Sequence, residues 1–548
     1  MSLREERDQL VIVLHGHLPY VRGAGAWPHG EEWLHEAVLD SYLPLAVALH
    51  DLRASGVDYR LTIGLTPTLL EQLGDPRVRD RSVAYIEDRM RRAERDAAEY
   101  AELGAKRRAG LAALYREDYA GRLDALQVRF GGDLVAAYRD LERTGHLDLL
   151  ASAATHGYLP LLDADSVDLQ IAVGRATSGR RFGLEPRGFW LPECAYAPGL
   201  ERALERHGIA YVFVDAPLLA VWQGPPPPEA ASSETLMRPP RSALERSLTP
   251  SGTAGPDAYD PHRIGASRVV AFARDPALSA RVWSAAYGYP GDAAYREFHK
   301  KDPRYGLRYW RVTGREVPLE GKAGYDPGPA TERALLHARD FVDAADTALS
   351  AHRDATGSLG TLVVAFDLEL FGHWWYEGVR WLGETLRLAA ASPRIRTATA
   401  PEALTAAGQA PPAALREGSW GLGGDHSTWL APRTAWMWDE IRSLATEVAR
   451  LRAEPPGDDL GRRALAQAAR ELLLAQSSDW PFLVTTEQAP DYATGRFRSH
   501  ADRCRRAIAI ARSGNESDRA ELERMEAADD LFPDIGAVLG RTGGRAAG

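Results

Sequence analysis

Seven short apolar segments, separated by stretches with helical periodicity, constrain the fold of this chain more than any other feature. The helical stretches include Tyr42–Ala54, Gly199–His207 and Pro329–Ala351. An alternation of strand and helix predicts a parallel sheet, either open or closed into a barrel. The seven predicted strands are Gln9–Leu14, Tyr59–Ile63, Leu149–Ala154, Arg187–Leu191, Tyr211–Val214, Arg268–Phe272 and Leu362–Phe366.

A polar or ionisable residue follows each predicted strand. One such residue is ordinary turn chemistry, but the pattern repeats after all seven strands. In a parallel barrel the C-terminal strand ends meet at one face, and that face carries the active site. The sequence therefore predicts a functional site built from strand ends. The residues concerned are, in chain order, His15 and His17, Thr66, His156, Glu193, Asp215, Arg274 and Asp367.

Two regions break the alternation of strand and helix. Residues 75–147 are dense in Arg, Glu and Ala at helical spacing, which predicts an inserted helical subdomain with solvated charged faces. From residue 401 onward the strands are expected to stop. Helical patterns at Thr434–Arg452, Arg462–Gln476 and Arg498–Arg512 predict a helical C-terminal domain instead.

These patterns divide the chain into four parts. Residues 223–258 are rich in Pro, Ser and Ala, which predicts a mobile loop. We expect a catalytic barrel over 1–74 and 148–400, the helical insertion over 75–147, the C-terminal domain over 401–538 and a flexible tail over 539–548.

Composition excludes several classes of protein. The 548 residues carry 66 Lys and Arg against 76 Asp and Glu, and this net charge of −10 disfavours a nucleic-acid partner. Apolar runs such as Leu10–Leu14 are far shorter than the roughly 20 residues of a membrane helix, and no secretory region follows the polar first residues. Cys194 and Cys504 are too few for a disulfide framework or a zinc cluster. We therefore expect a cytoplasmic protein with no nucleic-acid or membrane partner.

The motif HGHLPYVR places His15 and His17 two positions apart on a strand, so that both side chains lie on the same face. Such a pair is a common beginning of a metal site. It serves equally well to hydrogen-bond a substrate or a neighbouring carboxylate. No second cluster of His, Cys or Asp at metal-ligand spacing accompanies it, so the sequence favours the interpretation without a metal.

The motifs GFWLPECAY and AFDLELFGHWWYEG each place a carboxylate at a strand end beside tryptophan. Glu193 taken alone could cap the helix that begins near Pro198, and Glu369 could be a supporting or salt-bridged group. Glu193 and Asp367 together are the two carboxylates that glycosidic bond cleavage requires. Tryptophans that could line sugar subsites are Trp27, Trp190, Trp283, Trp374, Trp420 and Trp429.

The ordered set of motifs resembles glycoside hydrolase family 57, and within it the 1,4-α-glucan branching enzymes. The five family motifs are matched, in order, by HGHLPYVR, ATHGYLPLL (Ala154–Leu162), GFWLPECAY, AFDLELFGHWWYEG and SWGLGGDHSTWL (Ser419–Leu430). Two further segments, VWSAAYGYPGD (Val282–Asp292) and SSDWPFL (Ser477–Leu483), resemble the branching type in particular. The resemblance covers nearly the whole chain.

The resemblance implies a distorted (β/α)7 barrel with a helical insertion and a helical C-terminal domain. It also implies a retaining mechanism with Glu193 as nucleophile, Asp367 as general acid/base, and no metal ion or cofactor. The segment 223–258 departs from the family pattern by its length. The expected substrate-contacting residues are Arg274, Gly291, Trp420, Asp479, Trp27, Trp283, Trp429, His15, His17, His156 and, on the catalytic loop, Tyr259.

We therefore expect a branching enzyme that cleaves an α-1,4 glucan, such as amylose or a glycogen-like polysaccharide, and transfers the segment to a 6-hydroxyl. An α-amylase or a 4-α-glucanotransferase of the same family shares the catalytic pair and is the nearest alternative. More distant alternatives are a metal-dependent polysaccharide deacetylase built on His15 and His17, and a non-catalytic glucan-binding protein. The sequence does not show the oligomeric state, although a monomer is favoured.

Overall fold

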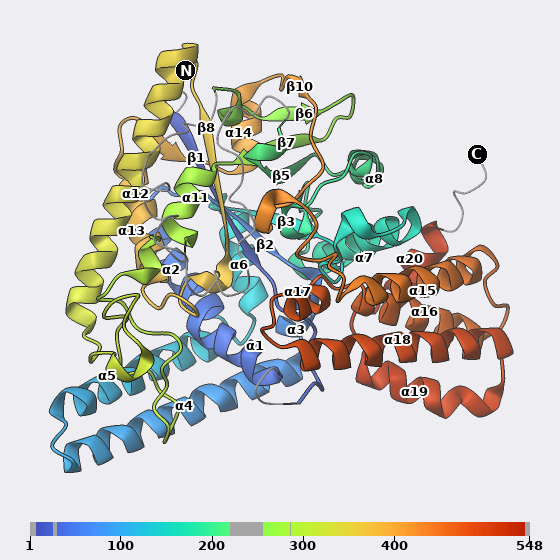
Figure 1. Ribbon diagram of the computed structural model, residues 1–548, viewed down its shortest axis with the longest axis horizontal. Helices are drawn as coiled ribbons and strands as arrows, with labels where there is room; N and C mark the ends of the chain where they lie inside the picture. Colours follow the sequence, from blue (N-terminus) through green and yellow to red (C-terminus); the bar gives the residue numbers. More distant parts are fainter. Residues whose placement is uncertain (1–6, 26–29, 220–255, 285–286, 543–548) are drawn as a thin grey trace.

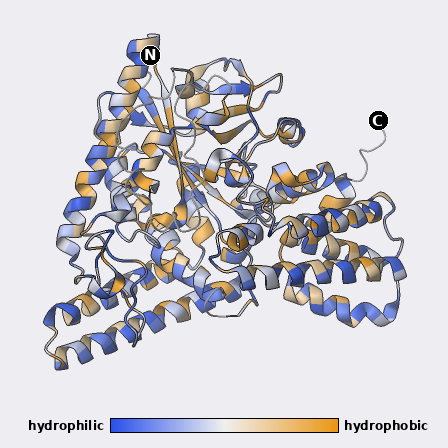
Figure 2. Cartoon of the chain, in the orientation of Figure 1, coloured by the Kyte–Doolittle hydropathy of each residue, from blue (hydrophilic) through white to orange (hydrophobic). Residues whose placement is uncertain are grey.

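The computed structural model describes residues 7–25, 30–219, 256–284 and 287–542. Trp27 and residues 223–255 of the expected loop lie outside the described residues. Figure 1 shows a central group of strands, a long helical hairpin that projects from it, and a further group of helices at the C-terminal side. Apolar residues concentrate along the central strands, whereas the projecting helices alternate between polar and apolar faces (Figure 2).

Seven parallel strands form a closed barrel, which confirms the predicted fold class. The order around the barrel is β1-β2-β3-β4-β5-β7-β8, and the ring closes where β7 pairs with β8 and β8 pairs with β1. All seven predicted strands are present. They are β1 (Asp8–Gly16), β2 (Leu61–Leu65), β3 (Leu147–Ser152), β4 (Gly188–Trp190), β5 (Tyr211–Asp215), β7 (Val270–Arg274) and β8 (Thr361–Asp367).

The first strand shows why these segments are apolar. Every residue of β1 is buried, because one face lies in the barrel interior and the other under the surrounding helices. A parallel strand covered on both faces has a nearly continuous apolar sequence rather than an alternating one, and DQLVIVLHG follows this rule at its centre. In the register between β1 and β8, His15 is the partner of Asp367. The two residues therefore lie side by side at the C-terminal end of the barrel.

Three very short strands extend the sheet beyond the barrel. The strand β6 (His262–Ile264) pairs antiparallel with β7, β9 (Ile395–Thr397) pairs parallel with β1, and β10 (Pro412–Ala413) pairs with β6. The expectation that strands stop at residue 401 is therefore wrong for β10. Two or three residues carry no periodicity that a sequence pattern could detect.

Helices cover the outside of the barrel (Figure 1). The longest, α12, begins where the carboxylate of Asp326 accepts a hydrogen bond from the N–H of Gly328, and it ends at Gly357 in the left-handed conformation. Among the described residues, no helix combines the length and the apolar character needed to cross a membrane. The helices that precede or follow barrel strands are α1 (Glu31–Ala37), α2 (Leu43–Ala54), α3 (Pro67–Leu73), α7 (Ala164–Phe182), α8 (Leu200–Arg206), α11 (Pro276–Trp283), α12 (Pro327–Thr356), α13 (Gly378–Ala391) and α14 (Ala400–Ala407).

The insertion after α3 contains three helices. Helices α4 (Pro76–Glu102) and α5 (Lys106–Asp124) pack side by side as a projecting hairpin, whereas α6 (Leu134–Arg143) packs on β3 and α2 (Figure 1). Buried tyrosines tie the hairpin to a loop that precedes α12. The hydroxyl of Tyr115 donates to the carbonyl of Arg308, and the hydroxyl of Tyr309 donates to Asp96, each at 2.6 Å.

The C-terminal helices enclose a core of their own, in which Trp438, Leu472 and Phe497 are buried, so this helical domain is as predicted. Helix α20 continues to Thr542, inside the stretch expected to be a tail. A backbone bridge between Gly157 and Ser477 joins the domain to the barrel. The helices are α15 (Ala435–Ala453), α16 (Asp459–Ala475), α17 (Asp479–Thr485), α18 (Pro490–Ser513), α19 (Arg519–Ala528) and α20 (Ile535–Thr542).

Candidate active site

Glu193 lies in a strained turn directly after β4. Its φ is 62° and that of Cys194 is 48°, so two successive residues other than glycine adopt the left-handed conformation. Such backbone costs about 1–3 kcal/mol per residue and is concentrated at functional sites. The nearby helix α8 has no side-chain cap at its N-terminus, so Glu193 does not serve as a helix cap. The turn instead directs the carboxylate toward groups from the C-terminal part of the chain.

Each carboxylate oxygen of Glu193 accepts one hydrogen bond. The indole Nε1 of Trp420 donates to Oε2 at 2.8 Å, and the hydroxyl of Ser478 donates to Oε1 at 3.2 Å. The Nδ1 atom of His156 lies 3.7 Å from Oε1. The backbone N–H of Trp420 also donates to the carbonyl of Glu193. A carboxylate oxygen has two lone pairs, so each oxygen retains one that can react with a ligand.

Asp367 ends β8, and its charge acts on the carboxyl group of Glu193. Next to it, Glu369 is buried and accepts hydrogen bonds from the hydroxyl of Tyr42 and from the backbone N–H of His17. Glu369 is therefore a supporting group with its own partners. The side chains of Glu193 and Asp367 are both partly exposed. A group that contacts a substrate must be accessible in this way.

The electrostatic environment favours the neutral form of both carboxyl groups. The pKa of Glu193 is raised to about 7, chiefly by burial; the hydrogen bond from Trp420 opposes the rise, and the charge of Asp367 contributes to it. Burial raises the pKa of Asp367 to about 8, with Glu369 adding to the shift and His17 and Arg274 opposing it. Two carboxyl groups with raised pKa values at one strand-end face can hold and release protons near neutral pH, which is what general acid/base chemistry needs.

Three histidines form a stack behind Glu193. The ring of His17 lies 4.1 Å from that of His156, the ring of His15 lies 4.9 Å from that of His156, and the other face of His15 rests on Trp190 at 4.6 Å. The Nε2 atoms of His15 and His156 are hydrogen-bonded to each other at 2.9 Å. His17 contacts Thr66 through Nδ1 and Asp479 through Nε2.

This arrangement bears on the alternative of a metal site. The ring nitrogens of His17 are engaged with a hydroxyl and a carboxylate, and the two Nε2 atoms of His15 and His156 with each other. Within the described ranges, neither His15 nor His17 belongs to a group of three or more side chains spaced to hold one ion. The geometry therefore gives the deacetylase alternative no support.

Arg274 completes the ring of polar groups. Its Nε donates to Asp215 at 2.8 Å, and its guanidinium lies 5.2 Å from the centre of the Trp420 ring. Trp420 in turn contacts Trp190 edge to face at 5.2 Å. Strand ends and a C-terminal segment thus bring together eight of the expected residues, namely His15, His17, His156, Glu193, Arg274, Asp367, Trp420 and Asp479.

Other expected substrate contacts are placed differently. Trp429 is 1% exposed and stacks on Tyr158, so its ring offers no face to a sugar in this structure. Tyr259 is buried, and its hydroxyl donates to Asp275 rather than into the site. A sequence motif identifies an aromatic residue but does not show whether its ring is exposed.

Two further expected contacts lie near the surface. Trp283 is 45% exposed and its ring lies 6.3 Å from that of Trp374, so it presents a free aromatic face. Gly291 lacks a side chain where a Cβ atom would meet the guanidinium of Arg315 at 2.4 Å. The space beside Gly291 is thus taken by an arginine of this chain rather than open.

Sequence reasoning missed two residues of the site, Ser478 and Tyr42. Ser478 lies in the quoted segment SSDWPFL, immediately before Asp479, but nothing in that segment shows that its hydroxyl reaches Glu193. Tyr42 donates to Glu369 from the start of α2. Both contacts join segments that are distant in sequence, and only the fold brings them together.

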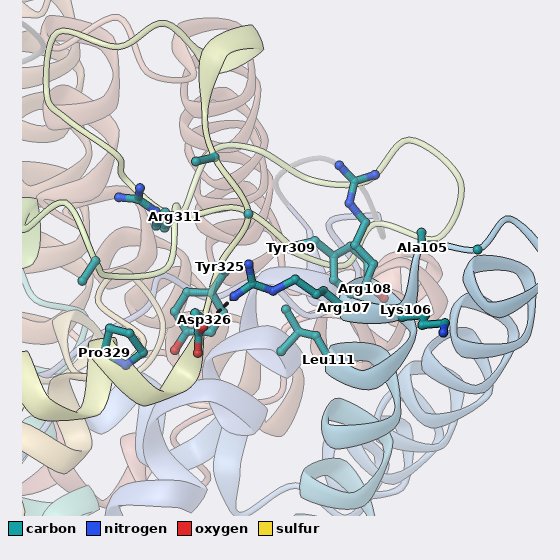
Figure 3. A pocket seen from close by; sticks show the side chains of 14 residues that line it. Ala105, Lys106, Arg107, Arg108, Leu111, Tyr309, Arg311, Tyr325, Asp326 and Pro329 are labelled. Atoms are coloured by element: carbon teal, nitrogen blue, oxygen red, sulfur yellow. Dashed lines mark hydrogen bonds and ion pairs between the residues drawn. The ribbon is translucent and has the colours of Figure 1, made fainter.

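A cavity of about 890 Å³ lies elsewhere, between the start of α5 and the loop before α12 (Figure 3). Arg107 reaches across it to form an ion pair with Asp326. Tyr309 and Tyr325, which line it, have their hydroxyls bonded to buried carboxylates. None of the residues that surround Glu193 or Asp367 lines this cavity.

Comparison with known proteins identifies the family of this chain. A model described as glycosyl hydrolase family 57 matches residues 11–414, and one described as the C-terminal part of 1,4-alpha-glucan branching enzymes matches residues 439–539. The chain is 39% identical over 552 residues to a 1,4-alpha-glucan branching enzyme of Thermococcus kodakarensis, with 96% of this chain and 77% of that protein covered.

Solved structures agree. The crystal structure of the branching enzyme from Thermococcus gives a TM-score of 0.87 at 37% identity and covers 96% of this chain and 95% of that one. An alpha-amylase of Thermotoga maritima gives a TM-score of 0.83 at 29% identity, with 97% and 99% covered. The chain therefore belongs to glycoside hydrolase family 57.

Proposed function

We propose that this chain is a 1,4-α-glucan branching enzyme, which cleaves an α-1,4 glucan and transfers the released segment to a 6-hydroxyl. The observation that carries the proposal is the match of residues 439–539 to a domain described for branching enzymes, joined to a barrel with two facing carboxyl groups. The alpha-amylase of Thermotoga shares the whole fold, so the fold alone does not separate branching from hydrolysis.

We assign the two reacting groups as follows. Asp367, whose pKa is raised to about 8 by burial, is protonated at neutral pH and gives its proton to the leaving glycosidic oxygen. Glu193 attacks the anomeric carbon and forms a covalent glycosyl-enzyme. In retaining enzymes the two carboxyl groups stand about 5–5.5 Å apart, with an oxocarbenium-like transition state between them. The net result of two such displacements is retention.

The second displacement makes the branch. Asp367, now a carboxylate, removes the proton from the 6-hydroxyl of an acceptor glucan, whose oxygen then attacks the anomeric carbon and releases Glu193. Water competes with the acceptor, so transfer needs a site that holds the acceptor and excludes water. Trp420 above Glu193 and the exposed ring of Trp283 are the aromatic surfaces that we assign to glucan chains. Arg274 and Asp479 are assigned to hydroxyl contacts.

We expect a cytoplasmic, monomeric enzyme that acts on amylose-like or glycogen-like chains, and its acidic composition supports the absence of a nucleic-acid partner. We propose a division into a catalytic barrel over 1–74 and 148–400, an insertion over 75–147 and a C-terminal domain from 401; the positions of α4 to α6 and of α15 to α20 support this division.

The test is incubation of the purified chain with amylose, followed by proton NMR for α-1,6 linkages and an assay of reducing ends. New α-1,6 signals with few new reducing ends support branching, whereas many reducing ends without α-1,6 signals identify a hydrolase. Glu193→Gln and Asp367→Asn should each lower the rate at least about a thousandfold. Glu185→Gln, an exposed residue paired with Arg175, is the matched control and should leave the rate unchanged.

A further inference from the structure

Ser478 connects Glu193 to the buried histidines. Its hydroxyl lies 3.2 Å from Oε1 of Glu193 and 2.8 Å from Nδ1 of His156. Nε2 of His156 is bonded to Nε2 of His15, and Nδ1 of His15 is buried without a hydrogen-bond partner. One continuous chain of hydrogen bonds therefore runs from a buried end at His15 to the carboxylate.

The hydrogen bonds in this series have a preferred donor-to-acceptor direction. An ionised carboxylate only accepts hydrogen bonds, so the hydroxyl of Ser478 donates to Glu193 and must accept from Nδ1–H of His156. His156 is neutral because burial and the charge of His17 lower its pKa well below the usual value, which makes its Nε2 an acceptor for Nε2–H of His15. Neutral His15 then ends the chain with a bare nitrogen at Nδ1.

The opposite direction of the hydrogen-bond chain requires a protonated Glu193. If Glu193 carried the proton and donated to Ser478, each bond would reverse and the chain would end in an N–H group at Nδ1 of His15. No described residue accepts a hydrogen bond from that atom. An unpaired buried donor and an unpaired buried acceptor each cost about 1–3 kcal/mol, so the unpaired end at His15 does not separate the two directions. They differ at Glu193, because a hydrogen bond donated to a carboxylate stabilises its charged form. The hydrogen bond from Ser478 therefore favours the state in which Glu193 is charged.

We infer that Ser478, which the C-terminal domain delivers to the barrel, is a positioning residue that holds Glu193 charged and oriented through the chain His15–His156–Ser478. The inference rests on the proposed function only in taking Glu193 as the nucleophile. The backbone supports it independently, since Ser478 N–H donates to the carbonyl of His156 at 3.2 Å, and His156 adopts a left-handed φ of 56°.

Other charged and titratable groups lie around Glu193. The charges of Asp367 on β8, Asp479 on α17 and His17 after β1 act on it. His156 and Tyr158 also face it, and Arg274 on β7 lies against the ring of Trp420. The experiment must therefore change the hydrogen bond without changing any of these charges. Ser478→Ala does this, because serine is uncharged. Ser478→Thr retains the hydroxyl, and Ser166→Ala is a matched control, since Ser166 accepts from Gln476 at the same junction without contacting Glu193.

The readout is the indole N–H resonance of Trp420, which is bonded to Oε2 of Glu193 and reports the ionisation of that carboxyl. The resonance is assigned by its loss in Trp420→Phe. Ser478→Ala should raise the midpoint of its pH titration by about one unit. Ser478→Thr should restore the wild-type midpoint, and Ser166→Ala should not change it. Equal midpoints in Ser478→Ala and wild type would overturn the inference.

A second measurement separates this inference from the proposed function. The acidic limb of the pH profile of kcat/KM on amylose should move to higher pH by the same amount in Ser478→Ala. A shifted indole titration in a protein that makes no α-1,6 linkages supports the positioning role and contradicts the branching activity. An active branching enzyme whose indole titration does not shift supports the activity and contradicts the positioning role.

Discussion

The indole Nε1 of Trp420 donates a 2.8 Å hydrogen bond to Oε2 of Glu193, across 227 residues of sequence. The backbone N–H of the same tryptophan donates to the carbonyl of Glu193. Trp420 thus holds both the backbone and the side chain of Glu193, a residue in the strained left-handed conformation.

Removing this indole donor should slow catalysis without unfolding the protein. A hydrogen bond to a charged group contributes about 1.5–3 kcal/mol, so Trp420→Phe should lower kcat/KM on amylose by about tenfold or more. Trp436→Phe is the control, because the indole of Trp436 donates only to the carbonyl of Arg433 on the surface. Steady-state kinetics decide, and equal values for Trp420→Phe and wild type would contradict the role given to this contact.

The raised pKa values predict a narrow pH optimum. Activity needs Glu193 ionised, so kcat/KM should rise with pH through about 7. It also needs Asp367 protonated, so kcat/KM should fall through about 8. The profile of kcat/KM against pH should therefore be bell-shaped, with its maximum between these values. A rate that stays constant from pH 5 to pH 9 is incompatible with the two assignments.

The same pKa values predict a cost in stability. A carboxyl group with a raised pKa binds more protons in the folded than in the unfolded state at intermediate pH. The free energy of unfolding therefore falls as pH rises from the ordinary carboxyl range through about 8. Asp367→Asn removes this charge and should raise Tm by roughly a few degrees at pH 9 but not at pH 4. Differential scanning calorimetry at both pH values tests this, and an equal Tm change at the two would argue against it.

Exposed aromatic surface should affect substrate binding rather than the chemical step. Trp283 is 45% exposed, and an aromatic contact contributes about 0.5–1.5 kcal/mol. Trp283→Ala should therefore raise KM for amylose about three- to tenfold with little change in kcat. Trp436→Ala, at 37% exposure on α15, is the control. An unchanged KM in Trp283→Ala would remove this residue from the glucan path.

Chelation tests whether His15 and His17 bind a metal ion that the reaction needs. His15 is bonded to His156, and His17 is bonded to Thr66 and Asp479, so the proposed mechanism takes no step through a metal. Dialysis against EDTA should leave the branching rate unchanged. If EDTA abolished activity and added zinc restored it, the metal-dependent alternative would be supported instead.

The barrel could be predicted from sequence because each strand is covered on both faces and therefore apolar along its length, as β1 is. The strands of two or three residues could not, because β10 has no room for a pattern. The motifs single out Glu193 and Asp367 as candidates for the catalytic pair. The alternative that Glu193 caps a helix required the observed backbone conformation to exclude it.

Contacts between distant segments were beyond sequence reasoning. Ser478 lies 285 residues after Glu193, and no local signal relates them. The sequence also did not reveal which aromatic residues are buried. Trp429 and Tyr259 are of the types expected at a sugar site, but both lie under other side chains. A pattern indicates which residues are available, whereas packing decides which of their atoms remain free.

Both donors to Glu193 come from segments beyond the last barrel strand, β8. During synthesis, a nascent chain that has emerged through β8 carries Glu193 and Asp367 but neither Trp420 nor Ser478. The ribosome must release a further stretch, through residue 478, before the carboxylate receives its second partner. A nascent chain that ends soon after β8 therefore lacks both hydrogen bonds to the Glu193 carboxylate, and full activity is expected only after residue 478 has been synthesised and folded onto the barrel.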